Sequence, residues 1–235
     1  MEARKVLYHS NMPRIALLGG TGSHGAGLAL RFGAAGAEVA IGSRDATRAA
    51  DAAQRVQARL AKLGVDRPVQ GAENATVVGT ADIIALTVPF SALGPLLAEV
   101  APALAGKVVL DVINPVILAD NVFKMLPVPG GSVGQFIQTS VPSAQVVSGF
   151  KHVSARALWR AQRLKGDVLL CGDAPVAKRA IQDLVRSIPD LRAVDAGPLV
   201  HATYLENLTA LLLNLNRQHR VVTSVQILGL EPHPA

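Results

Sequence analysis

The sequence has a single cysteine, Cys171, and few aromatic residues, which make up 3% of its 235 residues. One cysteine excludes an intramolecular disulfide and any metal site built from several thiolates. Because Cys171 stands in the apolar run DVLLCGD, we expect a buried and unreactive thiol. Proteins that bind single-stranded nucleic acid stack bases on aromatic side chains interleaved with basic ones, so this composition argues against nucleic acid as a partner.

Two kinds of apolar segment are also missing. The N-terminal stretch MEARKVLYHSNMPR has no apolar core of the kind found in secretory signals, and we interpret residues 1–13 as a leader before the first strand. The longest stretch without charge, residues 83–98, is interrupted by Pro89, Gly94 and Pro95, and it predicts a strand, a turn and a helix instead of a membrane span. We therefore expect a cytoplasmic protein with no membrane partner.

Charged residues are sparse, at 17% of the chain, while half of the residues are hydrophobic, which is typical of a folded domain. Lys and Arg number 23 against 17 Asp and Glu, so the formal net charge is +6. The basic residues are dispersed and form no polybasic tail. The excess either serves solubility or attracts a polyanionic small molecule, because a positive field concentrates anionic ligands.

Short apolar runs alternate with helical patterns in the first half of the chain. We expect strands over 14–18, 38–42, 68–72, 82–89 and 107–113. We expect helices between them over 23–35, 45–63 and 91–104. This alternation predicts the α/β class with a doubly wound parallel Rossmann sheet.

The alternation loosens after Asn114. We expect a helix over 132–139, strands over 145–150 and 167–172, a helix over 174–187, a strand near 192–197 and a long apolar helix over 199–219. We place a boundary near residue 125, between a nucleotide-binding Rossmann domain over 14–125 and a smaller C-terminal α/β domain over 126–235.

The segment GGTGSHG, residues 19–25, follows one predicted strand and opens a helix, which is the context that the dinucleotide-binding motif G-x-G-x-x-G requires. Gly20 allows the tight turn, Gly22 lets a pyrophosphate approach the backbone, and Gly25 lets the helix pack closely on the strand. The helix N-terminus offers free N–H groups to the phosphates. The sequence thus predicts a dinucleotide site whose loop also includes Thr21, Ser23 and His24.

The acidic residue that binds the ribose 2′-hydroxyl in NAD-dependent proteins, about 20 residues further on, is missing. Ser43 and Arg44 stand there instead. A hydroxyl and a guanidinium bind a 2′-phosphate, which an acid would repel, and Arg48 follows one helical turn later. We therefore predict NADP(H) as the cofactor of the domain over 14–125; the alternative is that both arginines are solvated helix residues. Asp45 is expected to cap the following helix.

Ligands of a doubly wound sheet lie beyond the carboxyl ends of its strands, so Val88 and Pro89, at the end of the strand over 82–89, are predicted to line the cofactor site. Pro89 also serves to end the strand. The sequence has no obvious catalytic dyad and no metal-ligand spacing such as H-E-x-x-H, so we expect no metal site.

Four segments together resemble the F420-dependent NADP reductases: RIALLGGTGSHGAGLALRFGAAGAEVAIGSR, DIIALTVP, LLCGD and DAGPLVHATYLENLTALLLNLN. The resemblance extends over most of the chain from residue 14 onward. It implies an oxidoreductase that transfers a hydride between NADP(H) and the deazaflavin coenzyme F420, which lies over the nicotinamide in the cleft between the two halves. It also implies a homodimer in which the helix over 199–219 takes part.

Carried over by position, the resemblance makes Thr21, Ser23, Ser43, Arg44 and Arg48 contacts of NADP(H). It makes Val88 and Pro89 the wall of the cleft.

In the family, a stretch similar to FHHVS contacts the deazaflavin side. Here the stretch reads GFKHVSA, in which Lys151 takes the position of the usual His and His152 follows it. Both are candidates for stabilising the negative charge that develops on the acceptor ring. The alternative is structural: a surface lysine and a hydrogen-bonded histidine near a strand end. Val153 and Ala155 complete the cofactor contacts predicted from this stretch.

Two other polar residues, His201 and Glu206 in the long helix, are expected to serve packing or a dimer contact. Residues 113–131 and Lys151 depart from the family pattern where the acceptor binds. One alternative therefore keeps NADPH but replaces the acceptor with a flavin, a pterin or a cyclic imine. A second alternative is a sensor that binds NADP(H) without turning it over. The sequence leaves the direction of hydride flow open.

Overall fold

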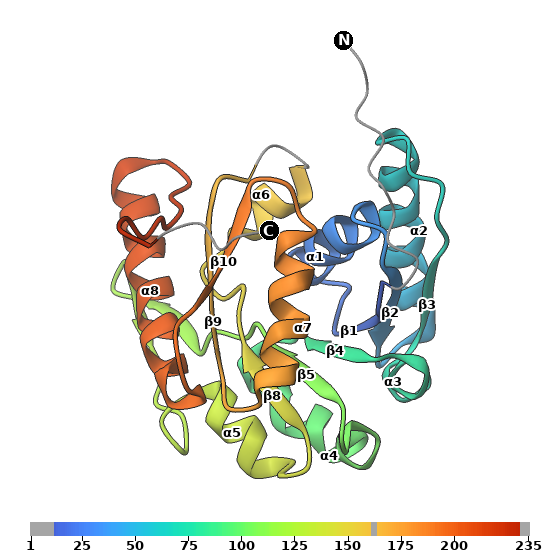
Figure 1. Ribbon diagram of the computed structural model, residues 1–235, viewed down its shortest axis with the longest axis horizontal. Coiled ribbons are helices and arrows are strands. Elements are labelled where there is room, and N and C mark those ends of the chain that lie inside the picture. Colours follow the sequence, from blue (N-terminus) through green and yellow to red (C-terminus); the bar gives the residue numbers. More distant parts are fainter. Residues whose placement is uncertain (1–11, 161–163, 231–235) are drawn as a thin grey trace.

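The computed structural model describes residues 12–160 and 164–230 (Figure 1). Its centre is an eight-stranded sheet in the order β10-β9-β8-β5-β4-β1-β2-β3. All neighbouring strands are parallel except β8 and β9, which are antiparallel. The predicted α/β class and doubly wound sheet are confirmed. The eight strands are β1 (Arg14–Leu18), β2 (Glu38–Ser43), β3 (Val69–Glu73), β4 (Ile83–Leu86), β5 (Val108–Asp111), β8 (Gln145–Ser148), β9 (Gly166–Gly172) and β10 (Leu191–Asp195).

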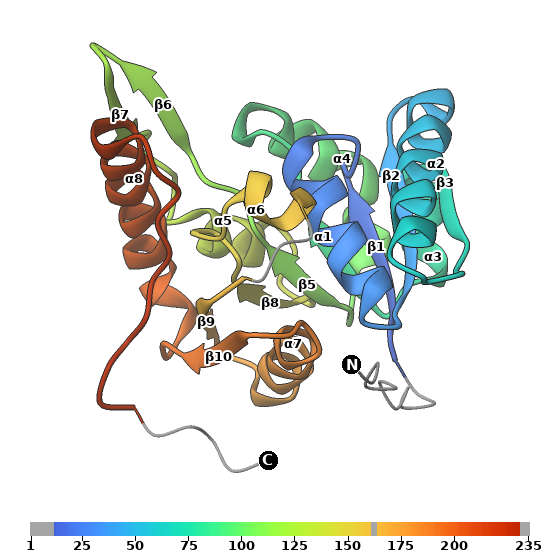
Figure 2. The same ribbon diagram turned by 90° about the horizontal axis from the view of Figure 1, so that it is seen from above.

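Helices cover both faces of the sheet (Figure 2). One face packs against α1 (Ser23–Ala34), α2 (Ala46–Lys62), α6 (Ala155–Arg160) and α7 (Pro175–Arg186), and buries large apolar side chains such as Phe32 and Phe150. The other face packs against α3 (Asn74–Thr80), α4 (Leu93–Leu104), α5 (Val133–Ser140) and the start of α8 (Ala202–His219). Two short 3₁₀ turns, η1 (Phe90–Ala92) and η2 (Leu199–His201), precede α4 and α8.

Where the structure describes them, the residues after 125 extend the first sheet and form no second one. β8 pairs in parallel with β5, in a register that places Asp111 opposite Ser148. β9 and β10 then continue the sheet beyond β8. The pairing satisfies the edge of β5 that would otherwise be left open. Because no break in the sheet marks residue 125, the division into two domains there stays a prediction.

β6 (Val116–Ala119) and β7 (Val122–Met125) form an antiparallel hairpin that was not predicted from the sequence. Its two turn residues, Asp120 and Asn121, have φ angles of 51° and 63°. Two successive residues with positive φ make the type I′ turn that suits the twist of a hairpin. Asn214 of α8 holds this hairpin, since its side chain accepts from Phe123 N at 2.8 Å and donates to Phe123 O at 3.0 Å.

Two short helices were also missed. In α3 the sequence NATVVGT combines β-branched residues with glycine, so its helical propensity is weak, and burial of Val77 and Val78 stabilises it instead. In α6, burial of Leu158 in the cluster that includes α1 stabilises the helix in the same way.

Three expectations from the sequence can be compared with the structure: the leader, the buried cysteine and the lack of a membrane span. Of the predicted leader, residues 1–11 lie outside the described residues, and Met12 packs against the core. Cys171 is buried as predicted, and burial raises the pKa of its thiol to about 11. Among the residues that the structure describes, no helix is both long enough and apolar enough to cross a bilayer.

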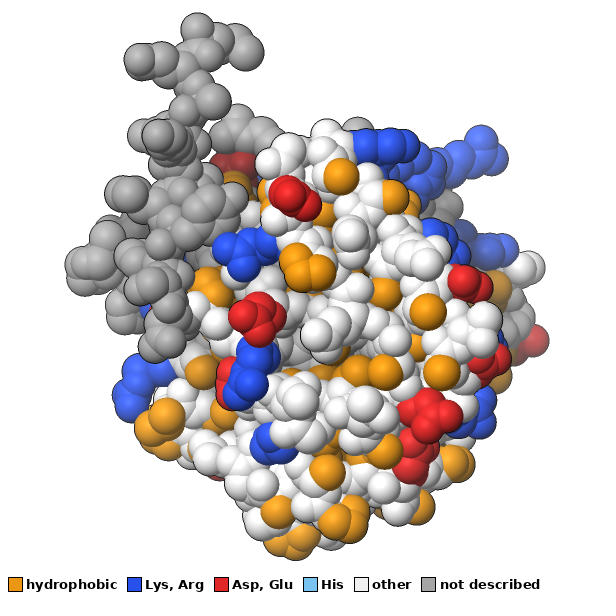
Figure 3. Space-filling view, turned by 90° about the vertical axis from the view of Figure 1, so that its right-hand side faces the viewer, with side chains coloured by type: hydrophobic (Ala, Val, Ile, Leu, Met, Phe, Trp, Pro, Cys, Tyr) orange, Lys and Arg blue, Asp and Glu red, His pale blue; other side chains and the backbone are white. Residues whose placement is uncertain are grey.

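Around α2 and β3, acidic and basic side chains are interspersed with apolar ones (Figure 3).

Candidate functional site

A cleft of about 910 Å³ lies at the carboxyl ends of four adjacent parallel strands, β2, β1, β4 and β5. This is the edge at which doubly wound sheets bind ligands. The loop after β1 contributes Gly19, Thr21, Gly22, Ser23 and His24 to its lining. The other lining residues follow β2, β3, β4 and β5: Ser43, Arg44, Asp45, Arg48, Asn74, Thr87, Val88, Pro89, Ser91, Ala92, Leu96, Val112, Ile113 and Asn114.

The glycines of the loop after β1 differ in what surrounds them. A Cβ on Gly20 would lie 2.8 Å from Leu17 O, and one on Gly25 would lie 2.6 Å from Gly20 Cα. These two glycines are therefore needed for the turn and for the approach of α1 to the loop, as predicted. A Cβ on Gly22 would meet nothing nearer than Gly19 O at 3.9 Å. The space over Gly22 is open on the cleft side, where a ligand can approach the backbone.

The N-terminus of α1 lies in the same loop. Gly22 is its N-cap residue and supplies no side-chain hydrogen bond to the first turn. The first N–H groups of a helix have no partner within the helix and carry a partial positive charge. Together with the open space at Gly22, they form a cradle that fits a pyrophosphate.

Ser43, Arg44 and Arg48 meet at one end of the cleft, beyond β2. Ser43 is buried and its Oγ accepts from Asp45 N at 3.2 Å, while both arginine side chains are exposed. Asp45 caps α2 as predicted, accepting from Arg48 N at 3.1 Å. Both guanidinium groups are exposed at the cleft and available to an anion, so these residues fit a 2′-phosphate.

The opposite end of the cleft lies beyond β4 and β5. Val88 covers Gly19 so closely that a Cβ on that glycine would lie 2.3 Å from Val88 Cγ1. Thr87 Oγ1 donates to Leu18 O at 2.8 Å and ties β4 to β1 below the loop. Val88 and Pro89 line the cleft as expected. Ile113 and Asn114 also line it and were not predicted, although they stand at the end of the strand expected over 107–113, at the same sheet edge.

Three lining side chains hold buried polar atoms without a hydrogen-bond partner in the described part of the chain: His24 Nε2, Asn74 Oδ1 and Asn114 Oδ1. Burial, assisted by the positive charge of Lys151, lowers the pKa of His24 to about 4. The imidazole is neutral at pH 7 and thus supplies no positive charge to a phosphate. Asn74 was missed in the sequence because only the pairing of β2 with β3 brings it to the cleft.

The stretch over 149–155 does not contribute to the lining of the cleft. His152 is buried, and its Nε2 lies 2.9 Å from Asp167 O. Val153 packs against the core and lines a separate cavity, and Ala155 begins α6. The chain turns this stretch away because Phe150 and Leu158 are buried against α1. The geometry therefore supports neither the predicted contacts of Val153 and Ala155 with the cofactor nor the predicted role of His152 at the acceptor ring.

Lys151 is not the surface lysine of the structural alternative, because its side chain is 0% exposed. It also does not line the cleft, so the expected direct contact with an acceptor ring is not supported either. His201 Nδ1 lies 2.7 Å from Ala196 O, and Glu206 is buried beside Lys151. These two residues thus serve packing within the chain, which is one of the two roles expected for them.

Comparison with known proteins agrees with this geometry. The family model described as NADP oxidoreductase coenzyme F420-dependent matches residues 14–115. The F420-dependent NADP reductase of Methanocaldococcus jannaschii is 32% identical over 222 residues, which cover 93% of this chain and 99% of that protein. The enzyme of the same name from Methanothermobacter marburgensis is 37% identical over 215 residues, or 88% of this chain and 94% of that protein.

A solved structure gives the same result. The crystal structure of a putative F420-dependent NADP reductase from Arthrobacter sp. FB24 superposes with a TM-score of 0.76 at 26% identity. The match covers 92% of this chain and 99% of that one. The similarity therefore extends over most of both chains.

Proposed function

Because the chain belongs to the F420-dependent NADP reductase family, we propose that it transfers a hydride between NADP(H) and the deazaflavin coenzyme F420. The observation that carries this proposal is the single cleft that joins a pyrophosphate cradle at Gly22 to a pair of free guanidinium groups. Arg44 and Arg48 replace the acid of NAD-binding sites and favour the phosphorylated cofactor. The match over nearly the whole length of two relatives supports the deazaflavin as the second substrate.

The order of the strands assigns each end of the cleft a part of the cofactor. From β2 to β5 there are three steps between neighbouring strands, or about 14 Å at the usual spacing. With the 2′-phosphate at Arg44 and the pyrophosphate at Gly22, the residues left for the nicotinamide are those beyond β4 and β5. In the proposed reaction, NADPH supplies a hydride to the deazaflavin. The task of the chain is to hold the two rings in contact and to exclude water.

The experiment that tests this function mixes the purified protein with NADPH and oxidised coenzyme F420. We expect rapid bleaching of the deazaflavin absorbance with NADPH and little or none with NADH. Tight binding of NADPH without bleaching would contradict the acceptor and keep the cofactor. Flavins, pterins and cyclic imines are then the acceptors to assay, and binding without turnover of any of them would favour a sensor.

We further propose that the chain forms a homodimer through α8 and the β6–β7 hairpin, which lie side by side (Figure 2). Tyr204 and Leu211 of α8 are 66% and 55% exposed, and the hairpin exposes Ile117, Leu118 and Val122. Exposed apolar side chains on two neighbouring elements are typical of an interaction site in a folded protein. A second copy of the chain is the partner that the family resemblance implies. The cytoplasmic location expected from the sequence stays a prediction.

We expect Leu211→Glu to turn the dimer into a monomer, because a charge placed within an apolar interface has no partner there. Sedimentation velocity at micromolar concentration measures the change. The matched control is Leu63→Glu, which changes an exposed leucine at the far end of α2 and should leave the dimer intact. A monomeric wild-type protein, or a dimer that survives the change at Leu211, would contradict this interface.

A further inference from the structure

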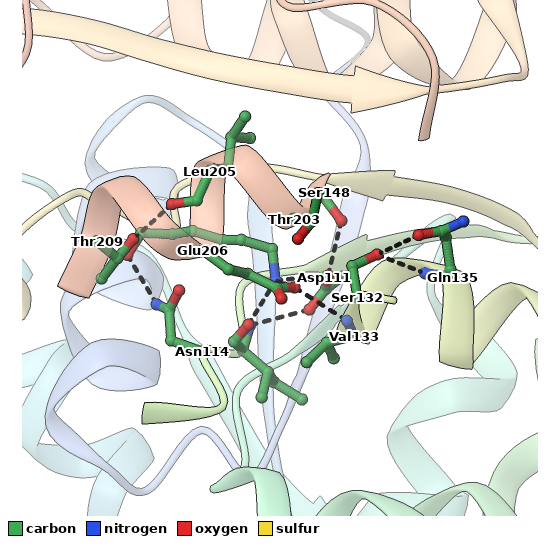
Figure 4. Close-up of polar contacts among 12 residues, drawn as sticks. Asp111, Asn114, Ser132, Val133, Gln135, Ser148, Thr203, Leu205, Glu206 and Thr209 are labelled. Carbon is green, nitrogen blue, oxygen red and sulfur yellow. Dashed lines mark hydrogen bonds and ion pairs between the residues drawn. The ribbon is translucent and has the colours of Figure 1, made fainter. Parts of the chain in front are cut away.

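A buried cation lies directly behind the wall of the cleft. The ammonium group of Lys151 lies 2.7 Å from Asp111 Oδ2 and 3.0 Å from Glu206 Oε1, and it also donates to Ile113 O. Figure 4 shows Asp111 and Glu206 close together at this point. The ammonium group thus makes hydrogen bonds to Ile113 O and Glu206 Oε1 and an ion pair with Asp111. The three ionisable side chains are almost fully enclosed, at 0%, 0% and 3% exposure. Three segments far apart in the sequence meet there: the end of β5, the turn after β8 and α8.

The carboxylates of this cluster are held by further hydrogen bonds. Asp111 Oδ2 accepts from Ser148 Oγ at 2.7 Å, and Glu206 Oε1 accepts from Val133 N at 3.0 Å. Burial raises the pKa of the Glu206 carboxyl, while Lys151 opposes that rise. Removal of one partner from such a cluster leaves charge buried without compensation.

Lys151 contacts two successive lining residues of the cleft from behind. Its ammonium group binds the carbonyl oxygen of Ile113, and its own carbonyl oxygen accepts from Asn114 Nδ2 at 2.8 Å. Asp111 completes this arrangement, because its Oδ1 accepts from Ile113 N at 3.0 Å. The backbone over 111–114 is therefore held on the side away from the cleft, and only its other side is available to a ligand.

The conformation that turns Lys151 inward is itself constrained. The preceding residue, Phe150, has a φ angle of 54° although it is bulky and fully buried. Its ring packs edge-on against Phe32 of α1 at a centroid distance of 5.6 Å. A non-glycine residue in the left-handed region persists only where its surroundings hold it, and such residues cluster at functional sites. The same helix, α1, carries the pyrophosphate cradle.

From these contacts we infer that Lys151 is a positioning residue, which fixes the Ile113–Asn114 wall of the cleft and thereby sets where the nicotinamide ring lies relative to its hydride acceptor. The expected effect of Lys151 on the rate rests on the proposed function. The expected effect of Lys151 on the bound nicotinamide requires only that the cleft binds NADPH. Lys151 touches neither ring, so it acts through the wall and is not a catalytic residue.

The test compares Lys151→Met with the wild-type protein by two measurements. Titration with NADPH gives the Kd, and the fluorescence of the bound dihydronicotinamide at saturation reports the surroundings of the ring. We expect the Kd to change by less than about threefold, because Arg44, Arg48 and the loop at Gly22 are untouched. We expect the fluorescence to move toward that of free NADPH and kcat to fall roughly 10- to 100-fold, since a displacement of about 1 Å has an effect of this size.

Two further variants separate positioning from a loss of fold. Lys151→Met with Glu206→Gln removes one of the two carboxylates left without their cation, so it should recover part of the thermal stability but neither the rate nor the fluorescence. Lys178→Met removes a lysine that pairs with Asp195 at 2.8 Å outside the cleft, and it should match the wild-type protein in both measurements.

Wild-type fluorescence and kcat in both Lys151 variants would overturn the inference. A loss of NADPH affinity as large as the loss of rate would also overturn it, because it would indicate a general structural role. A wild-type protein that fails to reduce coenzyme F420 would count against the proposed function alone, since the fluorescence comparison would still decide the role of Lys151.

Discussion

Replacing Arg44 with alanine is expected to weaken the binding of NADPH about 10- to 100-fold and to leave the binding of NADH within about twofold. A hydrogen bond to a charged group contributes about 1.5–3 kcal/mol, and each 1.4 kcal/mol is a factor of ten in Kd. Arg44 lines the cleft at the end of β2, and its side chain is exposed before any ligand binds. Only the cofactor with a 2′-phosphate can use its charge.

The measurement is a titration of each cofactor against the wild-type protein and the variant, at two salt concentrations. Salt should reduce the difference between the two proteins for NADPH, because exposed charges are screened. Arg55→Ala removes an exposed arginine of α2 that lies outside the cleft, and it serves as the control. Equal losses of affinity for NADPH and NADH would contradict the assignment of the 2′-phosphate to the Arg44 end of the cleft.

The second large effect is expected in the glycine loop, where one alanine substitution should affect cofactor binding alone and another should affect both binding and stability. Gly22→Ala should abolish measurable binding of both NADPH and NADH while the midpoint of urea unfolding stays near that of the wild-type protein. A Cβ there meets no protein atom nearer than 3.9 Å, so the fold accepts it. The same methyl group would occupy the space through which a pyrophosphate approaches the backbone.

Gly25→Ala should reduce both binding and stability. Its Cβ would lie 2.6 Å from Gly20 Cα and 2.8 Å from Thr87 Oγ1, so α1 must move away from the loop. Inserting a methylene into a packed site costs about 1–3 kcal/mol of the free energy of unfolding. Urea unfolding and cofactor titration on the same samples test both statements. Should Gly22→Ala bind NADPH normally, the cradle would not be the pyrophosphate site.

Local patterns in the sequence predicted much of the fold and one end of the site. The alternation of apolar runs with helical patterns identified β1, β2, β4 and β5 and the helices α1, α2 and α4, because each element buries a face that its own residues define. The glycine loop and the pair Ser43–Arg44 were recognisable because a parallel βαβ unit brings the ends of β1 and β2 together by a short connection. The cap at Asp45 depends on residues within one turn.

Other features depend on segments that are distant in the sequence. Lys151 appeared to be a candidate at the acceptor because its neighbours in the chain resemble a family motif. The structure places it behind the wall, where Asp111 and Glu206 come from 40 and 55 residues away. No local pattern specifies that meeting. It follows from the pairing of β8 with β5 and from the packing of α8 beneath them.

The sequence by itself thus determined the fold class, the dinucleotide loop and the preference for a 2′-phosphate, because short-range geometry is sufficient for each. Only the tertiary structure decided that His24 is neutral in its site, that Ile113 and Asn114 line the cleft, and that Lys151 holds them from behind. Burial and the meeting of charges are properties of the packed chain. They exist only once the sheet has brought its distant strands together.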